Sequence, residues 1–174
     1  WKSAQSTLVN TVYVAPGNAG TALEPGCDNV DIDTMDFAAL AAFAVDNEVG
    51  LTIVGPEAPL VEGVVDYFSE RGLPCFGPSK GAAQLEGSKS FTKDFLARHH
   101  IPSSSYQTFT ETGPAIAYIK KEGAPIVVKA DGLAAGKGVI VATSTAEAIA
   151  AVEDMLAGNA FGEAGHRVVV ESFL

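Results

Sequence analysis

The stretch Val127-Val128-Lys129-Ala130-Asp131-Gly132-Leu133-Ala134-Ala135-Gly136-Lys137-Gly138-Val139 is the most informative part of this chain. Glycines and small residues separate two β-branched runs, a pattern that predicts a β-hairpin with a glycine-rich connection. Such a connection leaves backbone N–H groups uncovered, and uncovered N–H groups can cradle a polyphosphate. Lys129 before the loop and Lys137 within it add positive charge suited to phosphate. We therefore predict a phosphate-covering loop; the competing interpretation is a flexible hairpin without a ligand.

The spacing of the glycines excludes a Walker A motif. That motif places four residues between its first glycine and a Gly-Lys pair, continues with Ser or Thr, and leads into a helix. Here three residues separate Gly132 from Gly136, Gly138 replaces the hydroxyl residue, and a strand follows. The loop also lies near the middle of the chain, after a sheet-forming unit, so a kinase is the least favoured nucleotide-binding alternative.

The residues around the loop predict a unit of mixed helices and strands. Its expected helices cover residues 88–99, 114–121 and 145–156, and its expected strands cover 106–109, 125–130, 139–142 and 167–171. The first half of the chain predicts strands over 11–15, 51–54 and 74–76, with helices over 37–46 and 61–71. Alternation of strand and helix implies a parallel sheet with right-handed crossovers. The expected fold class is therefore α/β, with two units joined between Gly77 and Ser90.

Glycine and proline turns follow the predicted strands of the first half. The carboxyl edge of a parallel sheet, where these turns are expected, is where open α/β sheets bind ligands. The runs 15–20 and 55–60 offer backbone donors without bulky side chains, as a sugar phosphate requires. Glu57 is a candidate to hold a ribose hydroxyl or an amine. Ordinary strand-ending turns are the alternative interpretation.

Two further stretches are candidate parts of a nucleotide site. Ser88 is a predicted helix cap that places Lys89 in the first turn, where a lysine opposes the helix dipole. A basic residue at this positive helix end makes sense where an anion binds, although a solvated surface lysine is equally compatible. At the end of the chain, Glu171 follows an apolar strand and precedes Phe173 and Leu174. This run predicts either a clamp for a flat base or an edge of the core.

The composition excludes several classes of partner. The 174 residues carry a formal net charge of -10, and the 11 basic residues are scattered, so we expect no nucleic-acid-binding face. No apolar run approaches the roughly 18 residues that span a membrane, and the start lacks the apolar core of a signal peptide. Cys27 and Cys75 are far apart and fit reduced structural thiols. We therefore expect a cytoplasmic protein without nucleic-acid or membrane partners.

Taken together, these stretches resemble the glycinamide ribonucleotide synthetases, which are the phosphoribosylamine–glycine ligases of the ATP-grasp class. The resemblance rests on the loop 129–139 and on the runs 15–20, 54–60 and 84–89, and it extends along essentially the whole chain. It implies a Rossmann-like, pre-ATP-grasp N-terminal domain over residues 1–90. It also implies the first part of an ATP-grasp domain over residues 91–174.

The family joins glycine to 5-phosphoribosylamine and converts ATP to ADP and phosphate. The resemblance implies that Lys89 and Lys129 contact the ATP phosphates and that a loop folds over them. The implied loop residues are Gly132, Leu133, Ala134, Ala135, Gly136, Lys137 and Gly138. Glu171 and the backbone around Phe173 and Leu174 would hold the adenine. The residues implied to face phosphoribosylamine are Gly17, Asn18, Gly55, Pro56 and Glu57.

The chain departs from the family pattern at both ends. The family's first strand and its glycine-rich loop precede the start of this sequence. The acidic ligands for Mg²⁺ or Mn²⁺ and the glycine pocket follow its end. We therefore expect no metal site in these residues and no catalysis by them alone, and we favour a monomer. The alternatives are another ATP-grasp ligase, such as a biotin carboxylase-like or formate-using purine enzyme, and a nucleotide-binding or interaction module without catalysis.

Overall fold

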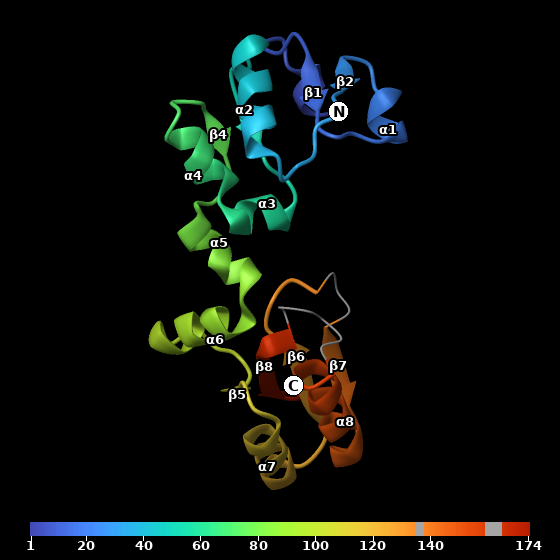
Figure 1. The fold of residues 1–174 in the computed structure, drawn as a ribbon, viewed down its shortest axis with the longest axis vertical. Helices are drawn as coiled ribbons and strands as arrows, with labels where there is room; N and C mark the ends of the chain where they lie inside the picture. The colour runs from blue at the N-terminus through green and yellow to red at the C-terminus, as the bar shows by residue number, and fades with distance from the viewer. Residues whose placement is uncertain (135–137, 159–164) are drawn as a thin grey trace. The chain divides into compact units, whose positions relative to one another are not determined.

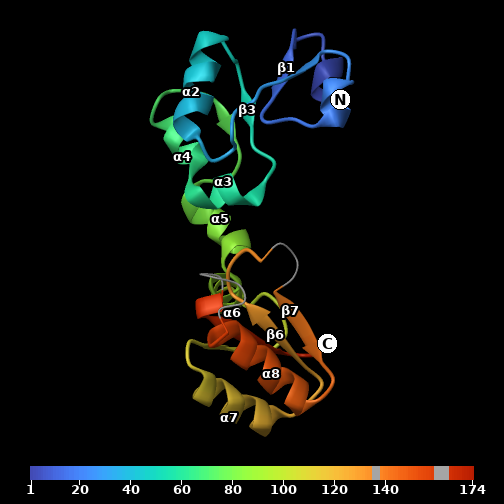
Figure 2. The same ribbon diagram turned by 45° about the vertical axis from the view of Figure 1, so that its right-hand side comes forward.

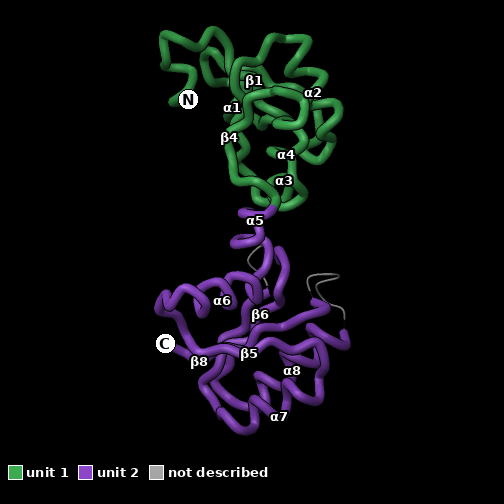
Figure 3. Tube along the Cα trace, turned by 90° about the vertical axis from the view of Figure 1, so that its left-hand side faces the viewer, with its two compact units in different colours: residues 1–80 green, residues 81–174 purple. Residues whose placement is uncertain are grey.

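The computed structural model describes residues 1–134, 138–158 and 165–174, which form both helices and strands (Figure 1). The chain divides into unit 1, residues 1–80, and unit 2, residues 81–174 (Figure 3). Each unit has its own apolar core. The expected α/β class is confirmed. Among the described residues, none of the helices is both long enough and apolar enough to cross a bilayer.

Unit 1 contains two separate pairs of parallel strands. β1 (Val12–Val14) pairs with β2 (Cys27–Asn29), and β3 (Thr52–Ile53) pairs with β4 (Cys75–Phe76). The sequence predicted β1, β3 and β4 but missed β2, because Cys-Asp-Asn lacks the β-branched and aromatic residues enriched in strands. The parallel direction of the pairing is confirmed. The prediction that β1, β3 and β4 share one sheet is wrong for the described residues, because β1 pairs with β2 and β3 pairs with β4 in a separate sheet.

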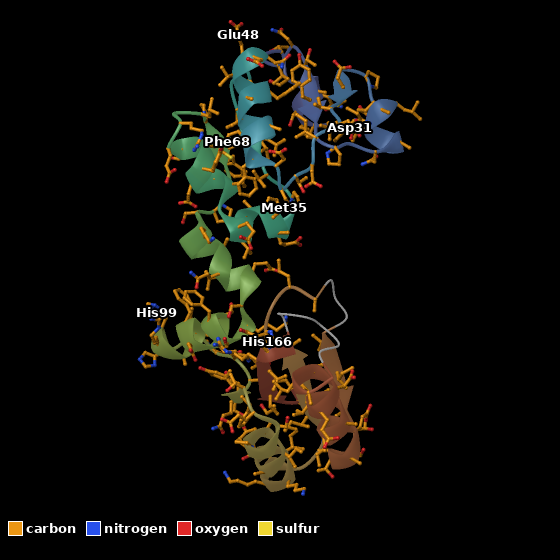
Figure 4. All side chains as sticks on the ribbon, viewed as in Figure 1. Asp31, Met35, Glu48, Phe68, His99 and His166 are labelled. Atoms are coloured by element: carbon orange, nitrogen blue, oxygen red, sulfur yellow. The ribbon has the colours of Figure 1, made fainter. Side chains whose placement is uncertain are left out.

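The helices of unit 1 are short. They are η1 (Ser3–Gln5), α1 (Ala19–Ala22), α2 (Phe37–Asp46), α3 (Glu57–Glu62) and α4 (Val64–Ser69). The single helix predicted over 61–71 is wrong, because Gly63 has a φ of 97° and separates α3 from α4. That left-handed backbone is accessible to glycine at little cost. The core packs α2 against α4, with Phe68, labelled in Figure 4, only 1% exposed.

Unit 2 holds an antiparallel sheet of four strands in the order β5-β8-β6-β7. These strands are β5 (Tyr106–Phe109), β6 (Ile126–Ala130), β7 (Val139–Ala142) and β8 (Val168–Ser172). The predicted hairpin is confirmed, because β6 pairs with β7 across the glycine-rich connection. The last strand of the chain, β8, inserts between β5 and β6, an arrangement that the sequence pattern did not reveal.

The helices from Lys80 onward are α5 (Lys80–Gly87), α6 (Lys89–Arg98), α7 (Thr112–Glu122) and α8 (Thr145–Leu156). Three of them, α6, α7 and α8, contact strands of the sheet. α7 and α8 lie side by side against one face (Figure 2), where the apolar side chains of α8 meet those of β6 and β8. Because side chains alternate along a strand, Val128 enters this core while Lys129 takes the opposite face. Glu171 on β8 shares that opposite face, and α6 lies over it.

Candidate functional site

A buried carboxylate lies between two lysines on the sheet face opposite α7 and α8. Glu171 is 5% exposed. Its Oε1 atom is 3.0 Å from Lys129 Nζ, and its Oε2 atom is 2.9 Å from Lys93 Nζ. The strand register explains the first contact, because Lys129 lies opposite Val169 and Glu171 lies opposite Val127. Lys129 and Glu171 are therefore diagonal neighbours on adjacent strands, within reach of long side chains.

Two serines before β5 complete this cluster. Ser104 Oγ donates a hydrogen bond to Glu171 Oε2 at 2.7 Å. Lys93 Nζ donates to Ser103 Oγ at 2.7 Å and to Ser104 Oγ at 2.6 Å. Burial by itself raises the pKa of Glu171, but the hydrogen bonds from Ser104, Lys93 and Lys129 outweigh it and hold the pKa below its ordinary value. Glu171 is therefore ionised at neutral pH.

A second cluster joins the start of α6 to the end of β6. Ser88 caps α6 by accepting the Phe91 N–H at 3.2 Å, and its Oγ donates to Asp131 Oδ2 at 3.1 Å. The Ser90 N–H donates to Asp131 Oδ1 at 2.6 Å. Arg167 Nη1, just before β8, is 3.5 Å from Asp131 Oδ2. The Asp131 carboxylate therefore fixes the first turn of α6 against the sheet.

Lys89 lies in the first turn of α6, as predicted, and its ammonium group reaches the glycine-rich loop. Lys89 Nζ donates to Gly132 O at 3.0 Å, and its backbone N–H donates to Asp131 O at 3.1 Å. Burial lowers the pKa of the Lys89 ammonium, Asp131 opposes that effect, and the charge of Lys129 adds to the lowering. A bound anion would stabilise the charged form of this desolvated lysine. The position therefore suits phosphate.

The described ends of the glycine-rich loop approach each other closely. Gly138 O accepts the Ala130 N–H at 2.8 Å, which continues the hairpin pairing beyond the strands. A Cβ atom on Gly138 would lie 2.6 Å from the Ala134 Cβ, so a larger residue cannot be placed there without displacing the loop. Leu133 is 41% exposed. The predictions for three loop residues lie outside the described residues: Ala135, Gly136 and Lys137.

The residues that follow β8 are open to solvent. Phe173 is 52% exposed and Leu174 is 91% exposed. The Ser172 N–H donates to Ser105 O at 2.9 Å, which fixes the backbone between Glu171 and these two residues. The carboxylate therefore points inward while the apolar side chains beside it stay accessible. Their contact with a base stays a prediction.

In unit 1, the turn after β1 is braced by β2. Gly17 has a φ of 77°, and a Cβ there would lie 2.2 Å from Asn29 Oδ1, so only glycine fits. Asn18 caps α1 by accepting the Gly20 and Thr21 N–H groups at 2.8 and 3.1 Å. Asn29 Nδ2 donates to Asn18 O at 2.9 Å, and Asn29 Oδ1 accepts from Thr21 Oγ1 at 2.7 Å. The Asn18 oxygens are thus used within the turn, and a role for Gly17 and Asn18 toward a substrate stays a prediction.

The turn after β3 differs from its prediction, because Glu57 begins a helix. Pro56 is the N-cap residue of α3, and Glu57 lies in the first turn, where a carboxylate favours the helix dipole. A side chain at Gly55 would meet no heavy atom within 4 Å. This part of unit 1 therefore has open space at the carboxyl end of a parallel strand. Contacts of Gly55, Pro56 and Glu57 with a substrate stay predictions.

The sequence predicted Lys89, Lys129 and Glu171 as site residues, and the structure brings these three together, whereas Lys93 and Ser104 were not predicted. Lys93 follows Lys89 by one helical turn, so both lie on one side of α6, and this spacing was the available signal. Ser104 lies between the helix expected over 88–99 and the strand expected over 106–109, in a stretch for which the sequence predicted no element. Only the pairing of β5 with β8 shows that this run lies beside Glu171. Within the described ranges, no group of three or more His, Cys, Asp or Glu side chains is placed to hold a metal ion.

Comparisons with known proteins place both units in one family. The model of the phosphoribosylglycinamide synthetase N domain matches residues 1–86, and the model of the ATP-grasp (A) domain of the same synthetase matches residues 87–174. The chain is 70% identical over 174 residues to a phosphoribosylamine–glycine ligase of Escherichia coli O6:H1 and 68% identical to that of Yersinia pestis. It spans 41% of the length of each of these relatives.

Solved structures show a similar fold. The phosphoribosylamine–glycine ligase of Thermotoga maritima matches with a TM-score of 0.74 and 30% identity, over 94% of this chain and 38% of that chain. A biotin carboxylase of Campylobacter jejuni, in a complex described as β-γ-ATP, matches with a TM-score of 0.69 and 20% identity, over 85% of this chain and 34% of that chain. The second likeness concerns the fold alone.

Proposed function

Because the chain belongs to the phosphoribosylglycinamide synthetase family, we propose that the protein containing it is an ATP-dependent carbon–nitrogen ligase. It joins glycine to 5-phosphoribosylamine and yields glycinamide ribonucleotide, ADP and phosphate, a step of purine biosynthesis. The observation that carries the proposal is that the N and A domain matches follow each other without a gap. The lysine and carboxylate cluster of unit 2 supports it, because it offers cations on a sheet face beside a glycine-rich loop.

The proposed ATP site lies in unit 2. Lys89 and Lys129 contact the phosphates, and the loop from Gly132 to Gly138 folds over them. Both lysines are partly buried, and the charge of Lys129 lowers the pKa of the Lys89 ammonium. A bound polyphosphate would offset the repulsion between the two ammonium groups. The backbone of Glu171, Phe173 and Leu174 holds the adenine, because the carboxylate oxygens of Glu171 already contact Lys93, Lys129 and Ser104. The exposure of the last two side chains supports this assignment.

The proposed phosphoribosylamine site lies in unit 1, at the turns after β1 and β3. Gly17 and Asn18 form the first turn, and Gly55, Pro56 and Glu57 form the second. Backbone groups without bulky side chains and the open space at Gly55 support this assignment.

The proposed reaction needs no covalent enzyme intermediate. A glycine carboxylate oxygen attacks the γ-phosphorus of ATP, ADP leaves, and glycyl phosphate forms. The amine of phosphoribosylamine then attacks the acyl carbon, and phosphate leaves with the glycine oxygen. The residues of this chain neutralise phosphate charge and hold the reactants in place, which are the large contributions to such a transfer. A divalent cation, Mg²⁺ or Mn²⁺, would neutralise further phosphate charge, and we assign it no ligand among the described residues.

We place the protein in the cytoplasm, as a monomer that acts on small molecules without nucleic-acid or membrane partners. The net charge of -10 supports the absence of a nucleic-acid partner, since it repels a polyanion. We expect residues 1–174 by themselves to form no product.

The proposal is tested by ADP formation in the complete protein that contains these residues. ADP should form only when glycine and phosphoribosylamine, generated in situ, are both present. Lys129→Met and Lys89→Met should each lower kcat/KM for ATP by about 100-fold or more, since each removes one cation from a desolvated phosphate site. Lys120→Met, on the exposed end of α7, is the matched control and should leave the rate unchanged. ADP formation that depends on bicarbonate or formate, in place of glycine, would overturn the proposal.

A further inference from the structure

Lys93 is a lysine of the candidate site that has no free N–H for a ligand. Its residue exposure is 7%. Its Nζ atom lies 2.9 Å from Glu171 Oε2, 2.7 Å from Ser103 Oγ, 2.6 Å from Ser104 Oγ and 3.2 Å from Ser104 O. A lysine ammonium has only three N–H donors. Protein acceptors therefore use all of them, and Lys93 cannot also bind a phosphate.

Lys129 contacts the same carboxylate from the other side. Its side chain is 27% exposed, against 9% for Lys93, so it is the lysine of the pair that a ligand can reach. In the part of the chain that the structure describes, Lys129 Nζ pairs with Glu171 Oε1. That contact occupies one donor and leaves the others for an incoming acceptor.

The division of Glu171 between two lysines has an electrostatic consequence. The three side chains together carry one net positive charge, because two ammonium groups share one carboxylate. If Lys93 were neutral, the buried carboxylate would cancel the charge of Lys129, and the net charge offered to a phosphate would be zero. Charges in such desolvated surroundings are weakly screened, so this loss would reach a bound polyphosphate.

We propose that Lys93 is a positioning residue of the ATP site: it neutralises and fixes Glu171 from the interior of unit 2, so that Glu171 orients Lys129 without cancelling its charge. This inference rests on the proposed function, because it assumes that Lys129 meets the ATP phosphates. Ser104 assists by donating to the same Oε2 atom that Lys93 contacts. Lys93 itself does not touch ATP.

The first test compares ATP with adenosine in the complete protein. Lys93→Met, which keeps the length of the side chain and removes its charge, should weaken ATP binding by about tenfold or more, since one charge of the phosphate site is lost. Adenosine binding should change by less than about threefold, because adenosine carries no phosphate. Lys120→Met removes a surface charge from the same unit and is the matched control, with both affinities unchanged. A structural role alone would weaken both ligands equally and would overturn the inference.

The second test restores the charge balance. The double variant Lys93→Met with Glu171→Gln again offers one net positive charge at Lys129, and the amide oxygen can still accept from Lys129 Nζ. Its ratio of ATP to adenosine affinity should return to within about threefold of the wild type. The double variant also leaves no buried carboxylate without its partner, so it stays folded if Lys93→Met alone does not. A double variant with a ratio as low as that of Lys93→Met, or about tenfold below the wild type, would contradict the inference.

The pH dependence of ATP binding supplies a third readout. Ser104→Ala removes a hydrogen bond that lowers the pKa of Glu171, while Lys93 from α6, Lys129 from β6 and the more distant Lys89 still face the carboxylate. Protonation of Glu171 raises the net charge of the three side chains from one to two. As the pH falls, the ratio of ATP to adenosine affinity should therefore begin to rise at a higher pH in this variant than in the wild type, and a rise at the same pH in both would count against the inference. The tests separate the two proposals. A wild-type protein that binds ATP while Lys93→Met equals Lys120→Met overturns only the inference, whereas a wild-type protein that does not bind ATP overturns both.

Discussion

Replacement of Asp131 by alanine should loosen the first turn of α6 and with it the position of Lys89. The Asp131 side chain is 13% exposed, and it accepts the Ser90 N–H at 2.6 Å and the Ser88 and Ser90 hydroxyls at 3.1 Å each. A hydrogen bond to a charged group contributes about 1.5–3 kcal/mol, and a donor left without its partner costs about 1–3 kcal/mol. The contribution of Arg167 is small, because its side chain is 49% exposed. These contacts share one carboxylate and do not add, so we expect a loss of about 2–4 kcal/mol in the local opening free energy of α6.

Hydrogen exchange of the peptide that covers the start of α6 measures this loss directly. A loss of about 2–4 kcal/mol corresponds to exchange that is roughly 30- to 700-fold faster at the Ser90 and Phe91 amides. Asp131→Asn keeps one acceptor for the Ser90 N–H and should show a smaller acceleration. Glu153→Ala removes an exposed acid from α8 and is the control, with exchange of α6 unchanged. Exchange of α6 within about threefold of the wild type in Asp131→Ala would refute the role assigned to this carboxylate.

Two further predictions concern stability. Glu48, just after α2 (Figure 4), has a φ of 51°, a left-handed backbone that glycine adopts at little cost. Glu48→Gly should therefore raise the free energy of unfolding by about 0.5–1 kcal/mol, whereas Glu48→Ala should not. Equal urea midpoints for the two variants would contradict this prediction. The hydrogen bond to Asp94, together with burial, raises the pKa of Tyr106 to about 12. Because the folded-state pKa is raised, its contribution to stability is present below the ordinary tyrosine value of about 10 and is lost as the pH rises through about 12. An absorbance titration should therefore show a late-ionising tyrosine that is missing in Tyr106→Phe, and identical titrations above pH 10 would contradict the assignment.

The sequence missed α5 but predicted the later helices and the strands of unit 2, because their patterns are strong and local. The β-branched runs on both sides of the glycine-rich loop are long, so the hairpin of β6 and β7 was found. Ser88 identified the start of α6, where its side chain caps the helix as expected. The position of Lys89 in the first turn of α6 was predicted for the same reason, because it follows directly from that cap.

Features that depend on distant contacts were not predicted. β2 has no strand-forming residues and exists because β1 gives it a partner. The break at Gly63 depends on a left-handed backbone that a glycine permits but does not require. The cluster around Glu171 combines residues from α6, the serines before β5 and the last strand of the chain. Lys93 belongs to this cluster only because β8 pairs with β5 and so places Glu171 beside it. Sequence spacing cannot reveal which strands are neighbours in a sheet of this order.

The most direct test of the account follows a labelled oxygen of glycine in the complete protein. Glycine with oxygen-18 in its carboxylate is supplied with ATP and phosphoribosylamine, and the phosphate released is analysed by mass spectrometry. The account predicts that each phosphate carries one labelled oxygen, because the glycine carboxylate attacks the γ-phosphorus before the amine displaces phosphate. Formation of product with unlabelled phosphate would contradict the account, since glycine would then not be activated by phosphoryl transfer.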